Sequence, residues 1–122
     1  MIRPTLELAV AFNRLARQDD EWFDEPDEFD RLQRALEVLD SIDDPITAAA
    51  VVAYRVAKAQ AFGEGNKRTG FLLAKWILDR NGEDGAALLP PDDREFAALL
   101  VRAASGVDVE AEMVEVLRRR HG

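Results

Sequence analysis

The chain of 122 residues contains no cysteine and a single histidine, His121, which is its penultimate residue. Without cysteine there are no disulfides and no thiol chemistry, which suits a reducing cytoplasm. A lone histidine at this position is expected to be solvated and inert. The sequence therefore excludes histidine-based metal sites and Ser-His-Asp catalysis.

Long apolar runs and strand patterns are also missing. No segment approaches the ~20 apolar residues that a membrane span needs, and the first residues lack the apolar stretch of a signal peptide. Nowhere do β-branched and polar residues alternate over a useful length. We therefore expect an all-α protein that is cytoplasmic and has no membrane partner.

Basic residues are fewer than acidic residues in this chain. Sixteen Lys and Arg residues face 24 Asp and Glu residues, which gives a net charge of −8. Nucleic-acid binding relies on basic residues that neutralise phosphates, so we expect no direct nucleic-acid partner, although a local basic site remains possible. Hydrophobic residues make up 48% of the chain, which is typical of a folded protein. The length suits one domain, which we expect to span residues 1–122.

Helix signals recur along the whole chain, and their number predicts about six helices. Thr5 can cap the first helix, and a second begins near residue 28. The stretch between them is acidic and predicts a loop that Trp22 and Phe23 anchor. The core positions expected from three- and four-residue spacing are Leu6, Leu8, Ala9, Phe12 and Leu15 in the first helix and Phe29, Leu32, Ala35, Leu36 and Leu39 in the second.

Two central, buried helices are predicted in the middle of the chain. Asp44 followed by Pro45 marks the start of a helix over residues 45–61, which is apolar nearly all round. A second apolar helix follows the stretch Gly-Glu-Gly-Asn-Lys-Arg-Thr and ends at Asn81-Gly82. After a connector that can include a short extended piece, two more helices complete the fold. The basic residues 118–120 at the end of the last helix are expected to fray.

The glycine turn between the two central helices has the composition of a phosphate site. Gly63 and Gly65 let a ligand approach the main chain, and the first amides of the following helix attract anions. Lys67 and Arg68 add positive charge at this point. Glu64 offers one hard oxygen ligand for Mg²⁺, which is commonly held by one or two carboxylates, waters and phosphates. One short stretch therefore holds the parts for a magnesium-bound phosphate.

Better-known phosphate motifs do not match this turn. The P-loop spacing is absent, and Arg68 stands where a dinucleotide fingerprint needs its third glycine. The alternative is an ordinary helix-helix turn with solvated charges. Four polar or charged side chains clustered between two helices that otherwise avoid charge favour a binding site.

The stretch "VAKAQAFGEGNKRTGFLLAKWILDRNG" resembles the core of the Fic/Doc family, and the Doc-like (death-on-curing) toxins in particular. Their motif reads His-x-Phe-x-(Asp or Glu)-(Gly or Ala)-Asn-Lys-Arg-Thr. The matching positions are Phe62, Glu64, Gly65, Asn66, Lys67, Arg68 and Thr69. The motif is specific, and the apolar helix with its Asn-Gly end matches as well.

The resemblance implies the small all-α Fic core and the use of ATP or a related nucleotide with Mg²⁺. Fic enzymes transfer AMP to a target hydroxyl, whereas Doc-like toxins transfer the γ-phosphoryl group to elongation factor Tu and halt translation. Such toxins belong to type II toxin–antitoxin systems, in which a Phd-like antitoxin covers the site. The expected partners are therefore an antitoxin and a translation factor.

The resemblance also implies a role for each motif residue. Glu64 would hold the metal, Gly63 and the amides of residues 65–67 would hold phosphate, and Asn66 would order the loop. Lys67 and Arg68 would contact phosphate and act in catalysis, with Phe62 and Thr69 as structural parts. Fic adenylyltransferases carry a second arginine three places after the first. That position is Phe71 here, which favours the Doc-like branch.

One departure affects the chemistry, because the family's catalytic histidine falls on Gln60. An amide has no pKa near neutrality and cannot carry away a proton, although it can orient a hydroxyl. Phosphoryl transfer depends mostly on positioning and electrostatics, and loss of a general base costs ~10²–10⁴-fold in rate. Three interpretations stay open: an impaired transferase with Gln60 in the catalytic position, a nucleotide-binding pseudoenzyme that acts through protein-protein binding, and an inactivated variant of a toxin.

Overall fold

The computed structural model describes residues 1–17 and 28–122, so the predicted anchors Trp22 and Phe23 lie outside the described residues. Every regular element in the described part is helical, as predicted. The elements are α1 (Leu6–Ala16), α2 (Phe29–Glu37), the 3₁₀ helix η1 (Val38–Ser41), α3 (Pro45–Ala59), α4 (Asn66–Arg80), α5 (Gly85–Leu88), α6 (Arg94–Ala104) and α7 (Glu110–His121).

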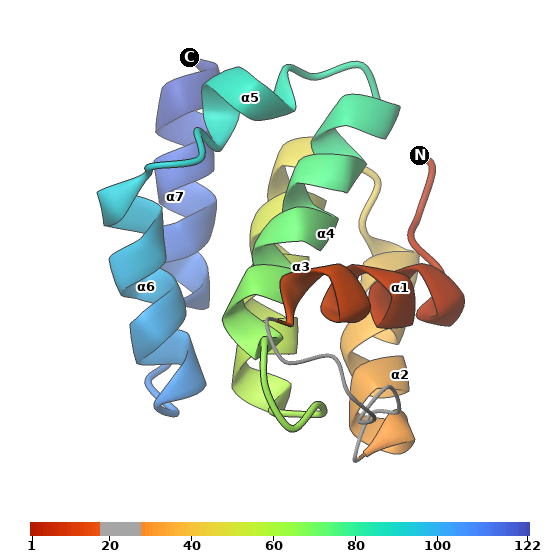
Figure 1. Ribbon diagram of the computed structural model, residues 1–122. Coiled ribbons are helices and arrows are strands. Elements are labelled where there is room, and N and C mark those ends of the chain that lie inside the picture. Colours follow the sequence, from red (N-terminus) through yellow and green to blue (C-terminus); the bar gives the residue numbers. More distant parts are fainter. Residues whose placement is uncertain (18–27) are drawn as a thin grey trace.

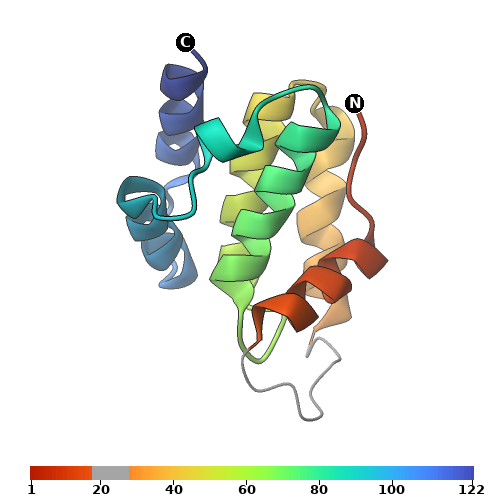
Figure 2. The same cartoon turned by 45° about the horizontal axis from the view of Figure 1, so that its top comes forward.

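Helices α3 and α4 form the centre of the molecule and run antiparallel (Figure 1). Helices α1 and α2 lie on one side of this pair, and α6 and α7 lie on the other. The short helix α5 leads from the end of α4 across to α6, and α1 crosses α4 steeply near its start (Figures 1 and 2). The loop between α3 and α4 is therefore placed at one end of the central pair, beside α1.

Local capping signals set the starts of the helices. The hydroxyl of Thr5 accepts a hydrogen bond from the Leu8 amide at 3.1 Å, and the carboxylate of Asp44 accepts from the Ile46 amide at 3.2 Å. These side chains satisfy amides that have no partner within their own helix. Both predicted helix starts are confirmed.

The centre of the core is α3, in which ten of the fifteen residues are buried. Helix α4 packs directly on its backbone at Gly70, because a Cβ atom at that position would lie 2.8 Å from the carbonyl oxygen of Ala53. The close crossing, with Gly70 of α4 against the alanine-rich helix α3, allows a dense core.

Two predicted core positions are wrong. Leu15 is 77% exposed and Phe29 is 43% exposed. The buried face of α1 consists instead of Ala9, Asn13 and Ala16. These three residues share a stripe at four- and three-residue spacing, and Leu15 lies to one side of it. A polar residue therefore occupies the middle of the packed face of α1.

The C-terminal part also departs from the prediction. The connector, for which the sequence allowed a short extended piece, contains the helix α5, whose start is capped by Asp84 through the Ala87 amide at 3.1 Å. Helix α7 continues to His121 without fraying. The guanidinium of Arg120 donates to the carboxylate of Asp93 and to the carbonyl of Leu88, so long-range bonds hold this end in place.

The predictions for His121 and for the end of α3 are wrong as well. His121 is half-exposed, and its Nε2 atom lies 3.2 Å from a carboxylate oxygen of Glu83, whereas the prediction was a freely solvated ring. Helix α3 ends at Ala59, two residues before the predicted end. No helix in the described ranges is both long and apolar enough to cross a membrane.

Candidate functional site

Helix α3 ends because Gln60 adopts a left-handed backbone conformation, with φ 51° and ψ 42°. No other non-glycine residue in the described ranges has a positive φ. The side-chain amide of Gln60 donates to the Ala57 carbonyl at 2.7 Å and thereby caps the end of its own helix. The residue at the position of the expected general base is thus a helix cap held by its own backbone.

Asn66 closes the turn that follows. Its side-chain oxygen accepts from the Phe62 amide and its side-chain nitrogen donates to the Phe62 carbonyl, each at 3.0 Å. The same nitrogen lies 3.4 Å from the side-chain oxygen of Gln60. Asn66 and Phe62 are both buried. This paired bond fixes the two ends of the turn, as expected of a residue that orders a loop.

A second brace comes from α1 and was missed by the sequence analysis. Asn13 is fully buried, and its amide donates to the Glu64 carbonyl at 2.8 Å and to the Thr69 hydroxyl at 3.2 Å. The Thr69 hydroxyl in turn donates to the Gly65 carbonyl at 2.7 Å. The side-chain oxygen of Asn13 accepts from Arg17 Nε at 2.7 Å. In the sequence, the only sign of this brace was a polar amide among the apolar positions of the first helix.

Gly65 gives the turn its shape at the start of α4. Its φ is +79°, and a Cβ atom there would lie 3.1 Å from the Asn13 side-chain nitrogen. Both the conformation and the space therefore call for glycine. Gly65 is also the N-cap of α4, and no side chain caps the first turn of this helix within the described residues. The first amides of α4 are thus available to an anion.

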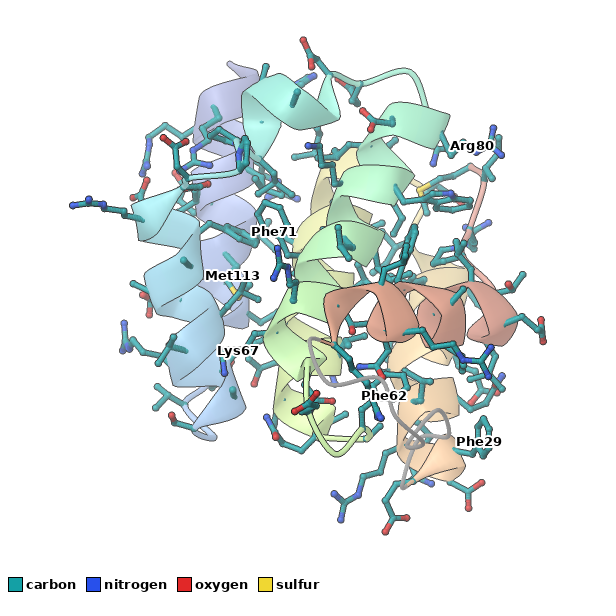
Figure 3. The ribbon with its side chains drawn as sticks, viewed as in Figure 1. Phe29, Phe62, Lys67, Phe71, Arg80 and Met113 are labelled. Atoms are coloured by element: carbon teal, nitrogen blue, oxygen red, sulfur yellow. The ribbon has the colours of Figure 1, made fainter. Side chains whose placement is uncertain are left out.

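Beside these amides, a hollow of about 430 Å³ lies between α4 and α6. Lys67, Arg68 and Lys75 supply positive charge at its edge, and Phe71 and Leu72 supply apolar surface. Lys67 and Phe71 both lie on the side of α4 that faces α6 (Figure 3). A hollow of this size with a few charged groups and an apolar wall is typical of a small-ligand site.

Glu64 and Gly63 form the exposed tip of the turn. The Glu64 carbonyl is held by Asn13, so its backbone position is fixed. Residues 1–17 and 28–122 contain no cluster of three or more potential metal-ligating side chains. One carboxylate beside free amides matches the way Mg²⁺ is held together with phosphate oxygens and water. The donor set therefore fits a metal that arrives with a phosphate.

The described residues form an all-helical fold, with a glycine turn between its two central helices. The family model for the Fic/DOC family matches residues 7–78, which is more than half of the chain and covers α2, α3, the whole turn and nearly all of α1 and α4. The chain belongs to the Fic/DOC family. No curated protein matches the sequence.

Proposed function

We propose that the chain is a Doc-like transferase, the toxin of a type II toxin–antitoxin pair. It moves a phosphoryl or nucleotidyl group from a Mg²⁺-bound nucleotide such as ATP to a hydroxyl of a translation factor such as elongation factor Tu. The main observation behind this proposal is the start of α4, where the N-cap Gly65 leaves the first amides without a side-chain cap, next to a charged hollow. A Phd-like antitoxin would cover this site.

The turn binds the phosphates. The amides of residues 65–67 and the positive end of the α4 dipole accept phosphate oxygens. Lys67 and Arg68 neutralise the remaining charge, and arginine can donate two parallel hydrogen bonds to one phosphate. Phe71 and Leu72 pack against the rest of the nucleotide in the hollow. Because position 71 is not arginine, the site has one cation fewer than adenylyltransferases, which supports phosphoryl transfer.

Glu64 contributes the metal ligand. Its carboxylate would hold Mg²⁺, which neutralises charge on the transferred group when bound. The bond from Asn13 to the Glu64 carbonyl keeps this carboxylate on a fixed piece of backbone. Preorganisation of this kind supports transfer because the reaction needs positioned charge more than covalent chemistry from the protein.

Gln60 limits the chemistry. The target hydroxyl oxygen forms a bond to phosphorus, the leaving oxygen keeps the electron pair of the broken bond, and the hydroxyl proton passes to water or to a phosphate oxygen. Gln60 can accept a hydrogen bond from the hydroxyl through its side-chain oxygen but cannot take the proton. We expect transfer that is slower by ~10²–10⁴-fold than with a histidine at this position.

The second candidate is a nucleotide-binding pseudoenzyme that acts through protein-protein binding. It is favoured by the contacts of Gln60, whose side-chain nitrogen donates to the Ala57 carbonyl and whose oxygen lies near the Asn66 amide. A carboxamide whose nitrogen and oxygen both contact the protein acts as a helix cap and not as a group that orients a substrate. In this case the phosphate site would regulate binding and would perform no transfer.

Calorimetry tests the phosphate site. ATP with Mg²⁺ should give a heat of binding that disappears with a chelator and in Glu64→Ala. The matched control is Glu115→Ala, which removes an exposed carboxylate from α7 and should bind like the wild type. Equal weak heats for all three proteins would show that the turn is no nucleotide site.

A transfer assay separates the two candidates. Elongation factor Tu is incubated with ATP labelled at the γ or the α phosphate, which distinguishes phosphoryl from nucleotidyl transfer. Gln60→His should label the factor faster than the wild type. Equal labelling rates would refute the proton-acceptor argument. Nucleotide binding without labelling by either protein would favour the pseudoenzyme.

A further inference from the structure

Helices α2 and α3 enclose a groove of about 720 Å³ that is separate from the hollow beside Lys67. We call it the α2–α3 groove. Its lining residues are Arg31, Arg34, Ala35, Glu37, Val38, Arg55, Lys58 and Ala59. Four of them are basic and one is acidic. This balance is opposite to that of the whole chain, whose net charge is −8.

Several contacts hold the basic side chains at the groove. Arg31 donates to the Ala59 carbonyl at 3.3 Å. Arg55 and Lys58 lie 5.9 Å and 5.5 Å from the centre of the Tyr54 ring. Arg55 also pairs with Glu110 at 2.7 Å. Arg31, Arg34 and Lys58 are exposed and offer charge to an occupant, whereas Arg55 is partly buried and paired with Glu110.

The floor of the groove is made of small apolar side chains, namely Ala35, Val38 and Ala59. An extended or helical polypeptide can approach such a floor closely, with its acidic side chains directed at the basic walls. Interfaces with this charge pattern gain specificity and association rate from complementary potentials. The groove therefore has both a contact surface and a charge preference.

One end of the groove lies beside the end of α3. Its lining includes Ala59, the last residue of α3, and the next residue is Gln60. In Figure 1, α2 and α3 lie behind α1 and α4, whereas the hollow beside Lys67 lies between α4 and α6. The two cavities thus approach the glycine turn from different sides of the central helix pair.

We propose that the α2–α3 groove binds an acidic segment of the polypeptide that is modified. This proposal rests on the proposed function. A nucleic acid is a poorer occupant, because its affinity comes from rows of phosphate contacts.

Fluorescence anisotropy tests the groove with a short fluorescein-labelled peptide that is rich in glutamate and carries one serine. The wild type should bind it, and added salt should weaken binding because exposed charges are screened. Reversing two groove charges in Arg34→Glu/Lys58→Glu should raise Kd about tenfold or more. The milder pair Arg34→Gln/Lys58→Gln should give an intermediate Kd.

The control is the same charge change on α4 and α6, outside the groove, in Arg80→Glu/Arg94→Glu. It should raise Kd less than about threefold, because only the net charge changes. Glu64→Ala should lose the heat of ATP binding and keep the peptide Kd, so failure of the groove is distinguishable from failure of the proposed function. The proposal would be overturned if the wild type did not bind the peptide, or if Arg34→Glu/Lys58→Glu and Arg80→Glu/Arg94→Glu weakened binding equally. It would also be overturned if polyuridylic acid displaced the peptide as efficiently as unlabelled peptide does.

Discussion

Replacing Asn13 by alanine removes the side chain that ties α1 to the glycine turn. Three hydrogen bonds disappear, two donated to Glu64 and Thr69 and one accepted from Arg17. The Thr69 hydroxyl keeps its bond to the Gly65 carbonyl. The Glu64 carbonyl and the Arg17 Nε group lose the partner that Asn13 supplied.

The expected loss of stability follows from these bonds. A neutral hydrogen bond contributes ~1 kcal/mol net, and one to a charged group contributes ~1.5–3 kcal/mol. Arg17 is only 8% exposed, and its Nη2 atom already has no partner among the described residues. A second unpaired nitrogen on this buried guanidinium is costly. We expect the free energy of unfolding to fall by about 3.5 kcal/mol, the sum of the lower values for the three bonds.

Urea unfolding followed by circular dichroism measures this loss. The melting temperature should fall by roughly 10 °C, given ~3–4 °C for each kcal/mol in a domain of this size. The matched control is Gln33→Ala, which truncates an exposed amide on α2 and should stay within ~0.5 kcal/mol of the wild type.

Asn13→Asp separates the donor role of Asn13 from its contact with Arg17. A carboxylate still accepts from Arg17, but it cannot donate to the Glu64 carbonyl and places negative charge beside it. This variant should be destabilised despite its ion pair. If Asn13→Ala matches Gln33→Ala, or if Asn13→Asp is as stable as the wild type, the brace between α1 and the turn has no energetic role.

Two further predictions concern the frame around the turn. Gly70→Ala should destabilise the fold by ~1–3 kcal/mol in urea unfolding, because the new Cβ meets the Ala53 carbonyl at 2.8 Å; a gain of ~0.5–1 kcal/mol, usual for glycine to alanine in an open helix, would contradict the close crossing. Burial opposes ionisation of Asp93, but hydrogen bonds from Arg120 and from the first amides of α6 outweigh it, so the pKa of Asp93 lies below its ordinary 3.8. Its stabilisation is therefore present above pH 3.8 and is lost as pH falls through the lowered pKa. Asp93→Asn should lower the urea midpoint at neutral pH and approach the wild type in acid, whereas the exposed Asp92→Asn should follow the wild type throughout.

The central helices could be predicted because their limits are encoded locally. Asp44 caps α3 from the residue before it, and Asn81 ends α4 three residues after its last apolar residue, Leu78. Signals of this kind act over one turn of helix and need no knowledge of the fold. For the same reason the motif residues of the turn could be located from their order alone.

The braces of the site could not be predicted because their partners are distant in sequence. Asn13 and Glu64 are 51 positions apart, and Arg120 and Asp93 are 27 positions apart. A sequence shows that Asn13 interrupts an apolar stripe, but it does not show which groups satisfy it. The groove charges are a similar case, because Arg34 and Lys58 meet only after α2 packs on α3.

If the proposed function holds, different residues of the turn bind the phosphate and take part in the transfer. Gln60 holds a left-handed conformation that costs a side-chain-bearing residue ~1–2 kcal/mol, and its bond to the Ala57 carbonyl offsets some of this cost. The two 3.0 Å bonds between Asn66 and Phe62 and the Gly65 conformation do not involve the Gln60 side chain, and the Asn66 contact with Gln60 is longer, at 3.4 Å. We therefore expect a histidine at position 60 to remove this longer contact and to keep the rest of the turn. Changes at Gln60 should alter the rate of transfer with little effect on nucleotide affinity, and changes at Glu64 should alter affinity first.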